Sequence, residues 1–429
     1  MTKRKRDMGS PSPRPPRPGV ADPCAGTIDW SWLPADLLST VFKRLPSDAD
    51  RVRVGAVCTR WVAAAAAWRP RPWLVGSRAD DRSGRSVAMS SFWLSQGDDG
   101  LVQFAAAMPD GSEYLSSSHG YLAVANPRAS TKTITLFNPV TTRRISLPPI
   151  SFFKKWHDVT TIVLSADPDA ADEWSAVAIA FPANCLAYYS SATGVWTPLR
   201  FTAAGYPGVE HYNGRFYVAF ESQLCVCELD VAAPAIIPLE QFDSDSDYSD
   251  NEAAALAAIE LKQANRYEHS WRDDEKLPGK RVVETHLVEC DGELLIVSVY
   301  GDVRYNSEST CKGSGGGAIC DERTVEVHRV EWMEDGRVKL EKEEDLGDNA
   351  LFLGRNHAFA LSAEKFPVCQ PNCVYLVDLQ GHPDGLVRVV DLDSYGQLTL
   401  RDENIYPVDG MQGSPSAGWA RRGWFIPKY

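Results

Sequence analysis

The stretch TITLFNPVTTRRISLPP, residues 133–149, carries the pattern that decides the fold. An apolar run containing β-branched residues leads into a polar turn, which is followed by a second short run and two prolines. This arrangement predicts a β-hairpin. A second copy, YSSATGVWTPL at residues 189–199, lies about 50 residues further on. Repeats of about 40 to 50 residues are typical of the blades of a β-propeller.

Similar β-rich runs recur through the rest of the chain after residue 100. The pairs Asn213-Gly214, Asp291-Gly292 and Asp335-Gly336 are strong signals for tight hairpin turns. Apart from one insert, no helical pattern separates the runs, so a parallel βαβ architecture is not expected. Setting the inserts aside leaves about 275 residues, enough for about six blades, with seven also open.

Two stretches of this region look inserted. Residues 242–276 are acidic and partly helical in pattern, and residues 305–322 are rich in Gly and Ser. The domain plan that follows is a linker and propeller start at 71–99 and an all-β propeller of about six or seven blades at 100–429.

The region from residue 29 to residue 70 has a helical period instead. In WLPADLLSTVFKRLP, residues 32–46, Pro34 suits a first helical turn and Pro46 ends the helix. A capping-box spacing of Ser47 and Asp50 restarts it. Each helical segment has an apolar stripe: Leu33, Leu37, Leu38, Val41, Phe42 and Leu45 in the first, and Val54, Val57, Cys58, Trp61 and Val62 in the second.

The apolar surface of these helices must be covered either by the rest of the chain or by a partner. Fewer than 45 residues are too few to bury all of it internally. The helices therefore either share a core with the rest of the chain or present a docking surface to a partner.

The N-terminal residues 1–28 are basic and rich in proline, which predicts disorder. The run Lys3, Arg4, Lys5 and Arg6 is a candidate nuclear import signal, although an unspecialised solvated tail has the same composition. We therefore expect the protein in the nucleus, the cytoplasm or both.

The net charge is −13, and the first 20 residues contribute +5, so the remainder carries −18. An acidic body is a poor binder of nucleic acid or anionic membrane. Ten cysteines without a framework and no signal segment predict a reduced intracellular protein. The most apolar stretch, residues 294–300, is far shorter than the roughly 20 residues of a membrane span.

Sharp catalytic motifs are absent from the sequence: it has no G-x-S-x-G elbow, no phosphate loop and no H-E-x-x-H helix. Neither Cys225 with Cys227 nor Cys369 with Cys373 has the spacing of a zinc knuckle. We interpret these thiols as core residues, and His119 and His357 as structural histidines in turns. No catalytic residue, metal or cofactor is predicted.

Residues 32–61 resemble an F-box, with its L-P-x-D-L-L and V-C-x-x-W patterns. The resemblance implies docking on the Skp-type adaptor of a cullin–RING ubiquitin ligase. Gly55 departs from the pattern, because glycine is a weaker helix former than the residue usually found there. The adaptor-binding residues that it implies are Leu33, Pro34, Leu37, Leu38, Val41, Leu45, Val57, Cys58 and Trp61.

Further along, SSSHGYLAVAN from residue 116 and ALFLGRNHAFALSAEKFPVCQPNCVYLVD from residue 350 resemble plant F-box proteins that carry a KIB-type β-propeller. This resemblance implies a substrate-recognition subunit of an SCF-type ligase, in which a small all-α F-box binds the adaptor and the propeller binds a target protein. No part of that role needs catalysis by this chain.

Two other functions stay open at this point. One is a nuclear regulator that acts without any ligase, through the basic tail and the acidic insert. The other is a propeller enzyme with a metal or carbohydrate site in the central channel. The second alternative needs carboxylates or histidines that converge from several blades.

Overall fold

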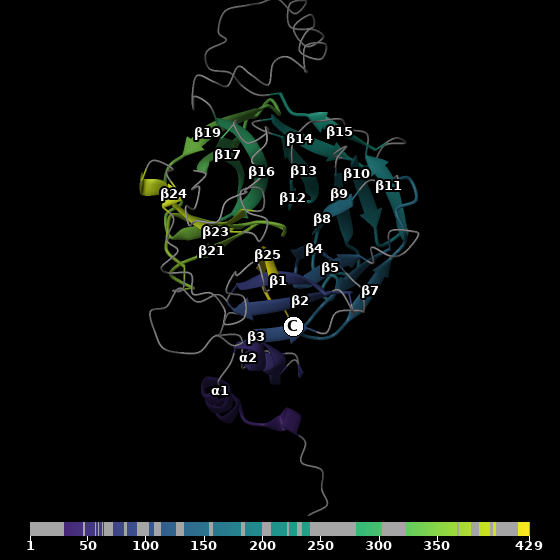
Figure 1. Cartoon of the computed structure of the whole chain (residues 1–429), viewed down its shortest axis with the longest axis vertical. Coiled ribbons are helices and arrows are strands. Elements are labelled where there is room, and N and C mark those ends of the chain that lie inside the picture. The colour runs from purple at the N-terminus through teal and green to yellow at the C-terminus, as the bar shows by residue number, and fades with distance from the viewer. Residues whose placement is uncertain are drawn as a thin grey trace, which may run out of the picture.

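The computed structural model describes a ring of β-sheets with two helices beside it (Figure 1). The candidate import signal at residues 3–6 and both inserts lie outside the described residues. No helix in the described part of the chain has the length and hydrophobicity of a membrane span. The description covers residues 30–45, 48–55, 57–58, 60–61, 63, 72–80, 84–91, 103–106, 113–125, 133–153, 158–181, 185–199, 207–220, 223–229, 234–240, 280–302, 323–366, 369–378, 386–394, 398–399 and 419–428.

The strands of the described residues form six sheets. The first sheet holds β1 (Trp73–Asp80), β2 (Gly84–Ser91), β3 (Gln103–Ala106) and β25 (Trp419–Phe425). The second holds β4 (Glu113–Ser118), β5 (Tyr121–Ala125), β6 (Ile134–Phe137) and β7 (Arg144–Leu147). The third holds β8 (Asp158–Leu164), β9 (Ser175–Phe181), β10 (Cys185–Ser190) and β11 (Val195–Leu199).

The other three sheets complete the ring. The fourth holds β12 (Gly208–Tyr212), β13 (Arg215–Phe220), β14 (Gln223–Glu228) and β15 (Ala235–Pro238). The fifth holds β16 (Lys280–Cys290), β17 (Glu293–Asp302), β18 (Thr324–Trp332) and β19 (Val338–Glu343). The sixth holds β20 (Asn349–Leu353), β21 (Phe359–Ser362), β22 (Cys373–Asp378), β23 (Leu386–Asp391) and β24 (Leu398–Thr399), with the short 3-10 helix η4 (Leu392–Ser394) after β23.

The predicted propeller is confirmed, and the predicted blade count is corrected. Five sheets are four-stranded antiparallel blades. The sixth sheet has five strands and mixed pairing, because β20 runs parallel to β22. The described residues therefore give five regular blades, fewer than the six or seven expected, and an irregular sheet that holds the remaining place in the ring. Spacing along the sequence could not reveal a strand that pairs in parallel.

The ring closes through strands from opposite ends of the chain. β25 pairs antiparallel with β1, so that Trp73 lies opposite Phe425, and β25 also contacts β4 and β22 of the neighbouring sheets. The first blade thus takes three strands from the N-terminal part of the propeller and one from its end. Such closure fastens the two ends of the propeller to each other within one sheet.

The hairpin pattern that opened the sequence analysis has a direct structural cause. The Asn138 side chain accepts hydrogen bonds from the backbone N–H groups of Val140 (2.9 Å) and Thr141 (3.1 Å), which fixes the turn between β6 and β7. In the second copy, Trp196 Nε1 donates to the carbonyl oxygen of Pro148 at 2.9 Å. The tryptophan of one blade therefore anchors on the proline that ends the previous one.

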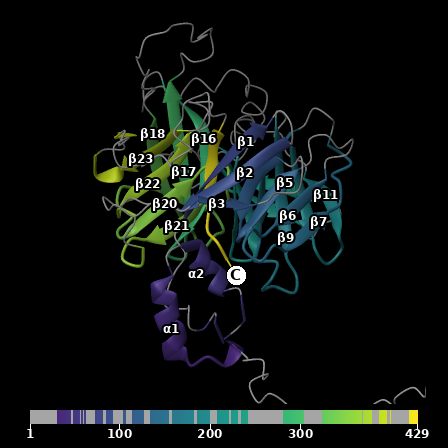
Figure 2. The same ribbon diagram turned by 60° about the horizontal axis from the view of Figure 1, so that its bottom comes forward.

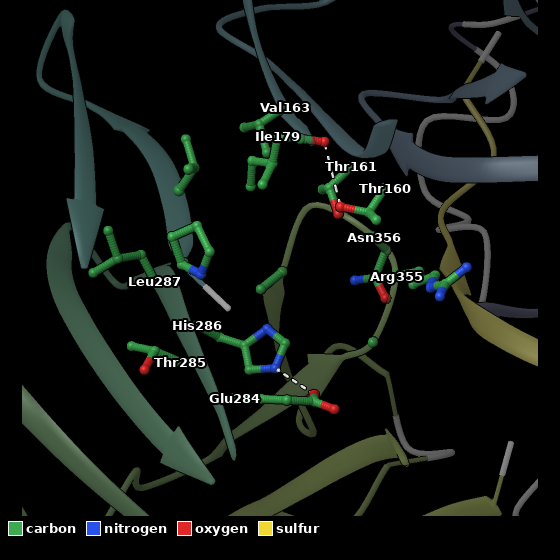
Figure 3. A pocket seen from close by; sticks show the side chains of 15 residues that line it. Thr160, Thr161, Val163, Ile179, Glu284, Thr285, His286, Leu287, Arg355 and Asn356 are labelled. Carbon is green, nitrogen blue, oxygen red and sulfur yellow. Dashed lines mark hydrogen bonds and ion pairs between the residues drawn. The ribbon is translucent and has the colours of Figure 1, made fainter. Parts of the chain in front are cut away.

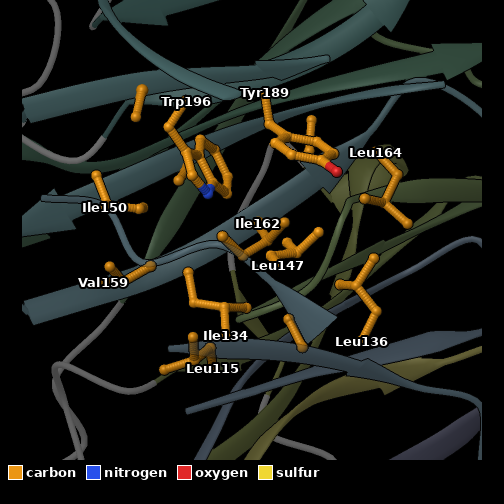
Figure 4. Packing of buried hydrophobic residues seen from close by; sticks show 14 of the residues in the cluster. Leu115, Ile134, Leu136, Leu147, Ile150, Val159, Ile162, Leu164, Tyr189 and Trp196 are labelled. Carbon is orange, nitrogen blue, oxygen red and sulfur yellow. The ribbon is translucent and has the colours of Figure 1, made fainter. Parts of the chain in front are cut away.

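Apolar side chains fill the spaces between neighbouring sheets. The space between the second and third sheets is closely packed by buried side chains from both (Figure 4). Each such layer removes an apolar face of two sheets from water, which is the main favourable contribution to folding. The layer in Figure 4 includes Leu115, Ile134, Leu136, Leu147, Ile150, Val159, Ile162, Leu164, Tyr189 and Trp196.

Three strands near the channel, β4, β8 and β16, share a local irregularity. The pairing shifts by one residue between Tyr114 and Ser116 in β4, between Val159 and Thr161 in β8, and between Val282 and Glu284 in β16. A bulge of this kind bends the strand and turns consecutive side chains to one face. It therefore changes which residues line the channel.

Two helices precede the ring, α1 (Ala35–Arg44) and α2 (Asp48–Gly55), after a short 3-10 helix η1 (Trp30–Trp32). Pro34 is the N-cap of α1, and α2 ends at Gly55. Val52 is fully buried in one cluster with Trp73 and Phe425, so α2 packs against the first sheet (Figure 2). The predicted helices are present, whereas the F-box itself stays a prediction.

Candidate functional site

The helical region presents an apolar surface to solvent. Leu37 is 53% exposed, Val41 is 42% exposed and Val57 is 59% exposed. Pro34 is also exposed, and Leu33, Leu45, Cys58 and Trp61 are half-buried. Leu38 differs from this group, because it is buried, as is Phe42 one turn further along α1. Of the nine predicted adaptor-binding residues, the structure therefore leaves all except Leu38 at least partly accessible.

Two tryptophans of the same helical region are exposed as well. Trp30 and Trp32 in η1 are 61% and 72% exposed. Trp61 Nε1 donates to the carbonyl oxygen of Trp30 at 3.1 Å, and the guanidinium of Arg60 lies 4.8 Å from the centre of the Trp32 ring. Sequence reasoning missed both residues, although two tryptophans just before a helix that begins at a proline were a visible signal. We use the name docking face for Trp30, Trp32, Leu37, Val41 and Val57.

A second site, which is polar, lies at the centre of the ring. There, three consecutive serines of β4 form hydrogen bonds to different neighbours. Ser116 Oγ donates to the carbonyl oxygen of Ile162 (3.1 Å) and accepts from its N–H (2.8 Å), joining β4 to β8. Ser117 Oγ donates to the carbonyl oxygen of Trp424 in β25. Ser118 Oγ accepts from the N–H of Leu164 at 3.1 Å. The SSS motif therefore joins the second sheet to the sheets on both sides.

His357 extends this network across the channel. Its Nδ1 lies 3.1 Å from Ser118 Oγ, and its Nε2 lies 2.6 Å from Glu210 Oε1 in β12. Because Ser118 Oγ accepts from Leu164, its own hydrogen is left to donate to Nδ1, and Nε2 then carries the proton that reaches Glu210. The imidazole thus connects the second, fourth and sixth sheets.

Two more histidines stand close to His357. The rings of His119 and His357 have their centres 5.4 Å apart, and Lys428 Nζ lies 3.4 Å from His119 Nδ1. Burial, followed by the nearby His357, Lys428 and His211, lowers the pKa of His119 to about 3. Burial also lowers the pKa of His211. These rings are therefore held neutral near pH 7.

The order serine, histidine, carboxylate is also that of a hydrolase triad, but the surroundings do not suit one. Ser118 is 7% exposed, and neither it nor His357 lines the cavity described below. A nucleophile needs space for a substrate carbonyl and donors for its oxyanion. The predicted structural role of His119 and His357 fits these contacts.

The signature GRNHA at residues 354–358 packs tightly against β25. Asn356 Oδ1 accepts from the N–H of Trp424 (3.1 Å), and Trp424 Nε1 donates to the carbonyl oxygens of Leu353 and Tyr375, both at 3.1 Å. A Cβ added at Gly423 would lie 2.9 Å from the carbonyl oxygen of Arg355. This close approach explains why glycine occupies the position.

The cysteines behave as core residues. Cys225, Cys227, Cys369 and Cys373 are buried, and none of them forms a disulfide. Burial raises the pKa of the Cys227 and Cys369 thiols to about 12, so both stay protonated and unreactive near neutral pH. Within the described residues, no group of three or more His, Cys, Asp or Glu side chains is placed to hold a metal ion.

A cavity of about 160 Å³ opens inside the ring, beside the bulges of β8 and β16 (Figure 3). Polar groups reach it from β8, from β16 and from the loop before β21. Its polar lining comprises Thr160, Thr161, Glu284, Thr285, His286, Arg355 and Asn356, and its apolar lining Val163, Ile179, Pro207, Val209, Leu287 and Ala358, together with Gly208 and Gly354.

A family model and one known protein match this chain over most of its length. The family model described as KIB1-4 beta-propeller matches residues 94–404. F-box protein SKIP23 of Arabidopsis thaliana is 25% identical, over 92% of this chain and 95% of that protein. A putative F-box protein of the same plant is 28% identical over 30% of this chain and 33% of its own. Among solved structures, the Malassezia sympodialis allergen Mala s 1 matches 69% of this chain and 94% of its own at 9% identity, with a TM-score of 0.24.

Proposed function

Because this chain belongs to the KIB1-4 β-propeller family, we propose that it is the substrate-recognition subunit of an SCF-type, cullin–RING ubiquitin ligase. In this proposal the α1–α2 region acts as an F-box that binds a Skp-type adaptor, and the ring binds the target protein. The names of the related F-box proteins support the role. Such a subunit works in the nucleus, the cytoplasm or both.

The observation that carries the proposal is the docking face. A short helical region gains little by exposing two tryptophans, a leucine and two valines to water unless a partner covers them. Full burial of one such side chain stabilises a complex by about 1.5 to 3 kcal/mol. A few central anchors of this kind account for most of the affinity of an interface.

Buried residues of the same helices support the other part of the proposal, in which the ring holds the target near the adaptor. Leu38 and Phe42 are buried, and Val52 is part of the core of the first sheet. The docking face is thereby attached to the ring rather than to a free tether. A receptor built in this way would hold a bound target at a limited range of distances from the adaptor, which raises the effective concentration of target lysines.

The test is binding of the full-length chain to a purified Skp-type adaptor. We expect a one-to-one complex with wild type and at least tenfold weaker binding by the double variant Leu37→Ala, Val41→Ala. Both residues are exposed, so the variant should keep its unfolding temperature, whereas a change at the buried Leu38 would disturb folding as well. Val195→Ala, at a residue 56% exposed on β11, is the matched control.

Failure of wild type to bind the adaptor would contradict the proposal, as would full affinity of the double variant. In the first case the helices would belong only to the protein's own packing. The ligase-independent nuclear role would then have to be tested by deleting residues 1–20.

A further inference from the structure

The cavity inside the ring has two facing polar walls. Thr160 and Thr161 of β8 lie on one side, and Glu284 and His286 of β16 lie on the other (Figure 3). Residues next to each other in a regular strand point to opposite faces. The bulge between Val159 and Thr161 breaks this alternation, so both threonines reach the cavity.

Glu284 is the main charged group that the cavity offers. Its side chain is 15% exposed, and its Oε2 lies 3.3 Å from His286 Nε2. Among the described residues, no hydrogen bond reaches its other carboxylate oxygen. A mostly buried carboxylate is costly unless donors or a positive charge compensate for the lost water. The cavity therefore favours a ligand that brings N–H donors and a positive charge.

The remaining lining fits the rest of such a ligand. The Thr160 hydroxyl donates to the carbonyl oxygen of Ile179 at 3.3 Å, which leaves its oxygen free to accept a further hydrogen bond. Val163, Val209 and Leu287 give the cavity an apolar wall beside these polar groups. Arg355 also lines the cavity, but in Figure 3 its guanidinium points away from Glu284.

We propose that this cavity binds an organic cation, an ammonium or guanidinium group on a short apolar chain, with the charged head on Glu284 and the chain along the apolar wall. The cavity volume of about 160 Å³ is large enough for such a ligand, since an apolar cavity of about 150 Å³ holds a molecule as large as benzene. The net charge of −13 also favours approach of a cation. The ligand is either a free amine or a lysine or arginine side chain of a bound protein, and only the second source rests on the proposed function.

The first experiment titrates the full-length chain with propylguanidinium and with propylurea, its uncharged analogue of similar shape, by calorimetry or protein-observed NMR. We expect saturable binding of propylguanidinium and at least tenfold weaker binding of propylurea. Glu284→Gln keeps the shape of the side chain, removes its charge, and should weaken propylguanidinium binding at least tenfold. Glu289→Gln, at an exposed residue of the same strand, should leave it unchanged.

Three results would overturn the proposal: no saturable binding to wild type, equal affinity for the two probes, or an unchanged affinity in Glu284→Gln. An unfolding temperature of Glu284→Gln close to that of wild type shows that a loss of binding is local. Adaptor binding measured on the same variant should be unchanged, so failure of the cavity and failure of the ligase role are separate results.

A second titration distinguishes the two sources. Acetyl-lysine-methylamide and acetyl-arginine-methylamide have the cationic side chain within a peptide backbone, and butylammonium and propylguanidinium have it alone. Tighter binding of the peptide forms assigns the cavity to a side chain of a bound protein. Binding of the free cations alone assigns it to a small molecule.

Discussion

His357 Nε2 and Glu210 Oε1 lie 2.6 Å apart and join the loop before β21 to β12 across the centre of the ring. Both side chains are well buried, at 13% and 4% exposed. Glu210 also accepts a hydrogen bond from the N–H of His211 at 3.0 Å. Hydrogen bonds to a buried carboxylate are among the stronger ones in proteins, and the loss of a partner leaves the charge poorly compensated.

We expect His357→Ala to lower the free energy of unfolding by about 3 kcal/mol, because Glu210 would then be left buried with a single hydrogen bond. Equilibrium denaturation with a double-mutant cycle measures the coupling. The double variant with Glu210→Gln should lose less than the sum of the two single variants, with a coupling of about 1 to 3 kcal/mol. Strictly additive losses would show that the two side chains do not act as a pair.

The partly buried His119 gives an expectation for the pH dependence of stability. Its pKa falls from an ordinary value near 6.5 to about 3 in the folded chain, so between these values the unfolded state binds the extra proton. The contribution of His119 to the free energy of unfolding is therefore fully present above about pH 7. It is lost as the pH falls below 6.5, by at most about 1.4 kcal/mol per pH unit. Thermal unfolding between pH 7.5 and 4.5 measures the slope.

The control for this slope is His119→Asn. His119 has a φ of 48°, a left-handed conformation that asparagine tolerates better than most residues. The variant should fold and should show a shallower decline of unfolding temperature with falling pH. An unchanged slope would assign the pH dependence to other groups.

Local patterns in the sequence were enough for the hairpins and their turns, although not for the number of blades. Asn213 and Gly214 both have positive φ, at 47° and 79°, as the predicted hairpin turn requires. The Asn138 turn and the pairing of β6 with β7 likewise depend only on neighbouring residues. Features encoded within about ten residues could therefore be predicted.

Features that depend on pairs of residues far apart in the sequence could not be predicted. The pairing of β1 with β25 joins opposite ends of the propeller, and Glu210 looks like an ordinary polar residue of a strand until His357 is placed beside it. The cavity was also invisible, because bulges in β8 and β16 decide which side chains face it. For the helices, the periodicity of the sequence placed Leu37 and Leu38 in one apolar stripe. It could not show that Leu38 is buried and Leu37 exposed.

The contact between β25 and the GRNHA loop should be sensitive to a single methyl group. In Gly423→Ala the new Cβ would lie 2.9 Å from both Asn356 Oδ1 and the carbonyl oxygen of Arg355, closer than such atoms pack. We expect a loss of about 1 to 3 kcal/mol of stability, because backbone on both sides has to move. Chemical denaturation compares this variant with Gly194→Asn, where the added side chain meets open space and asparagine tolerates the φ of 67°. Equal stabilities of the two variants would contradict the close packing.

The attachment of the helices to the ring depends on Val52, which is fully buried beside Trp73 and Phe425. Val52→Ala removes two methyl groups from this core and should weaken the attachment by about 1 to 3 kcal/mol. Because the lost contacts connect α2 to the first sheet, we expect faster backbone hydrogen exchange in residues 35–55 and little change in β8 to β19. Val57→Ala, at a residue 59% exposed, is the control and should leave the exchange of both regions unchanged. Unchanged exchange in α1 and α2 of the Val52 variant would mean that these helices are held to the ring by other contacts.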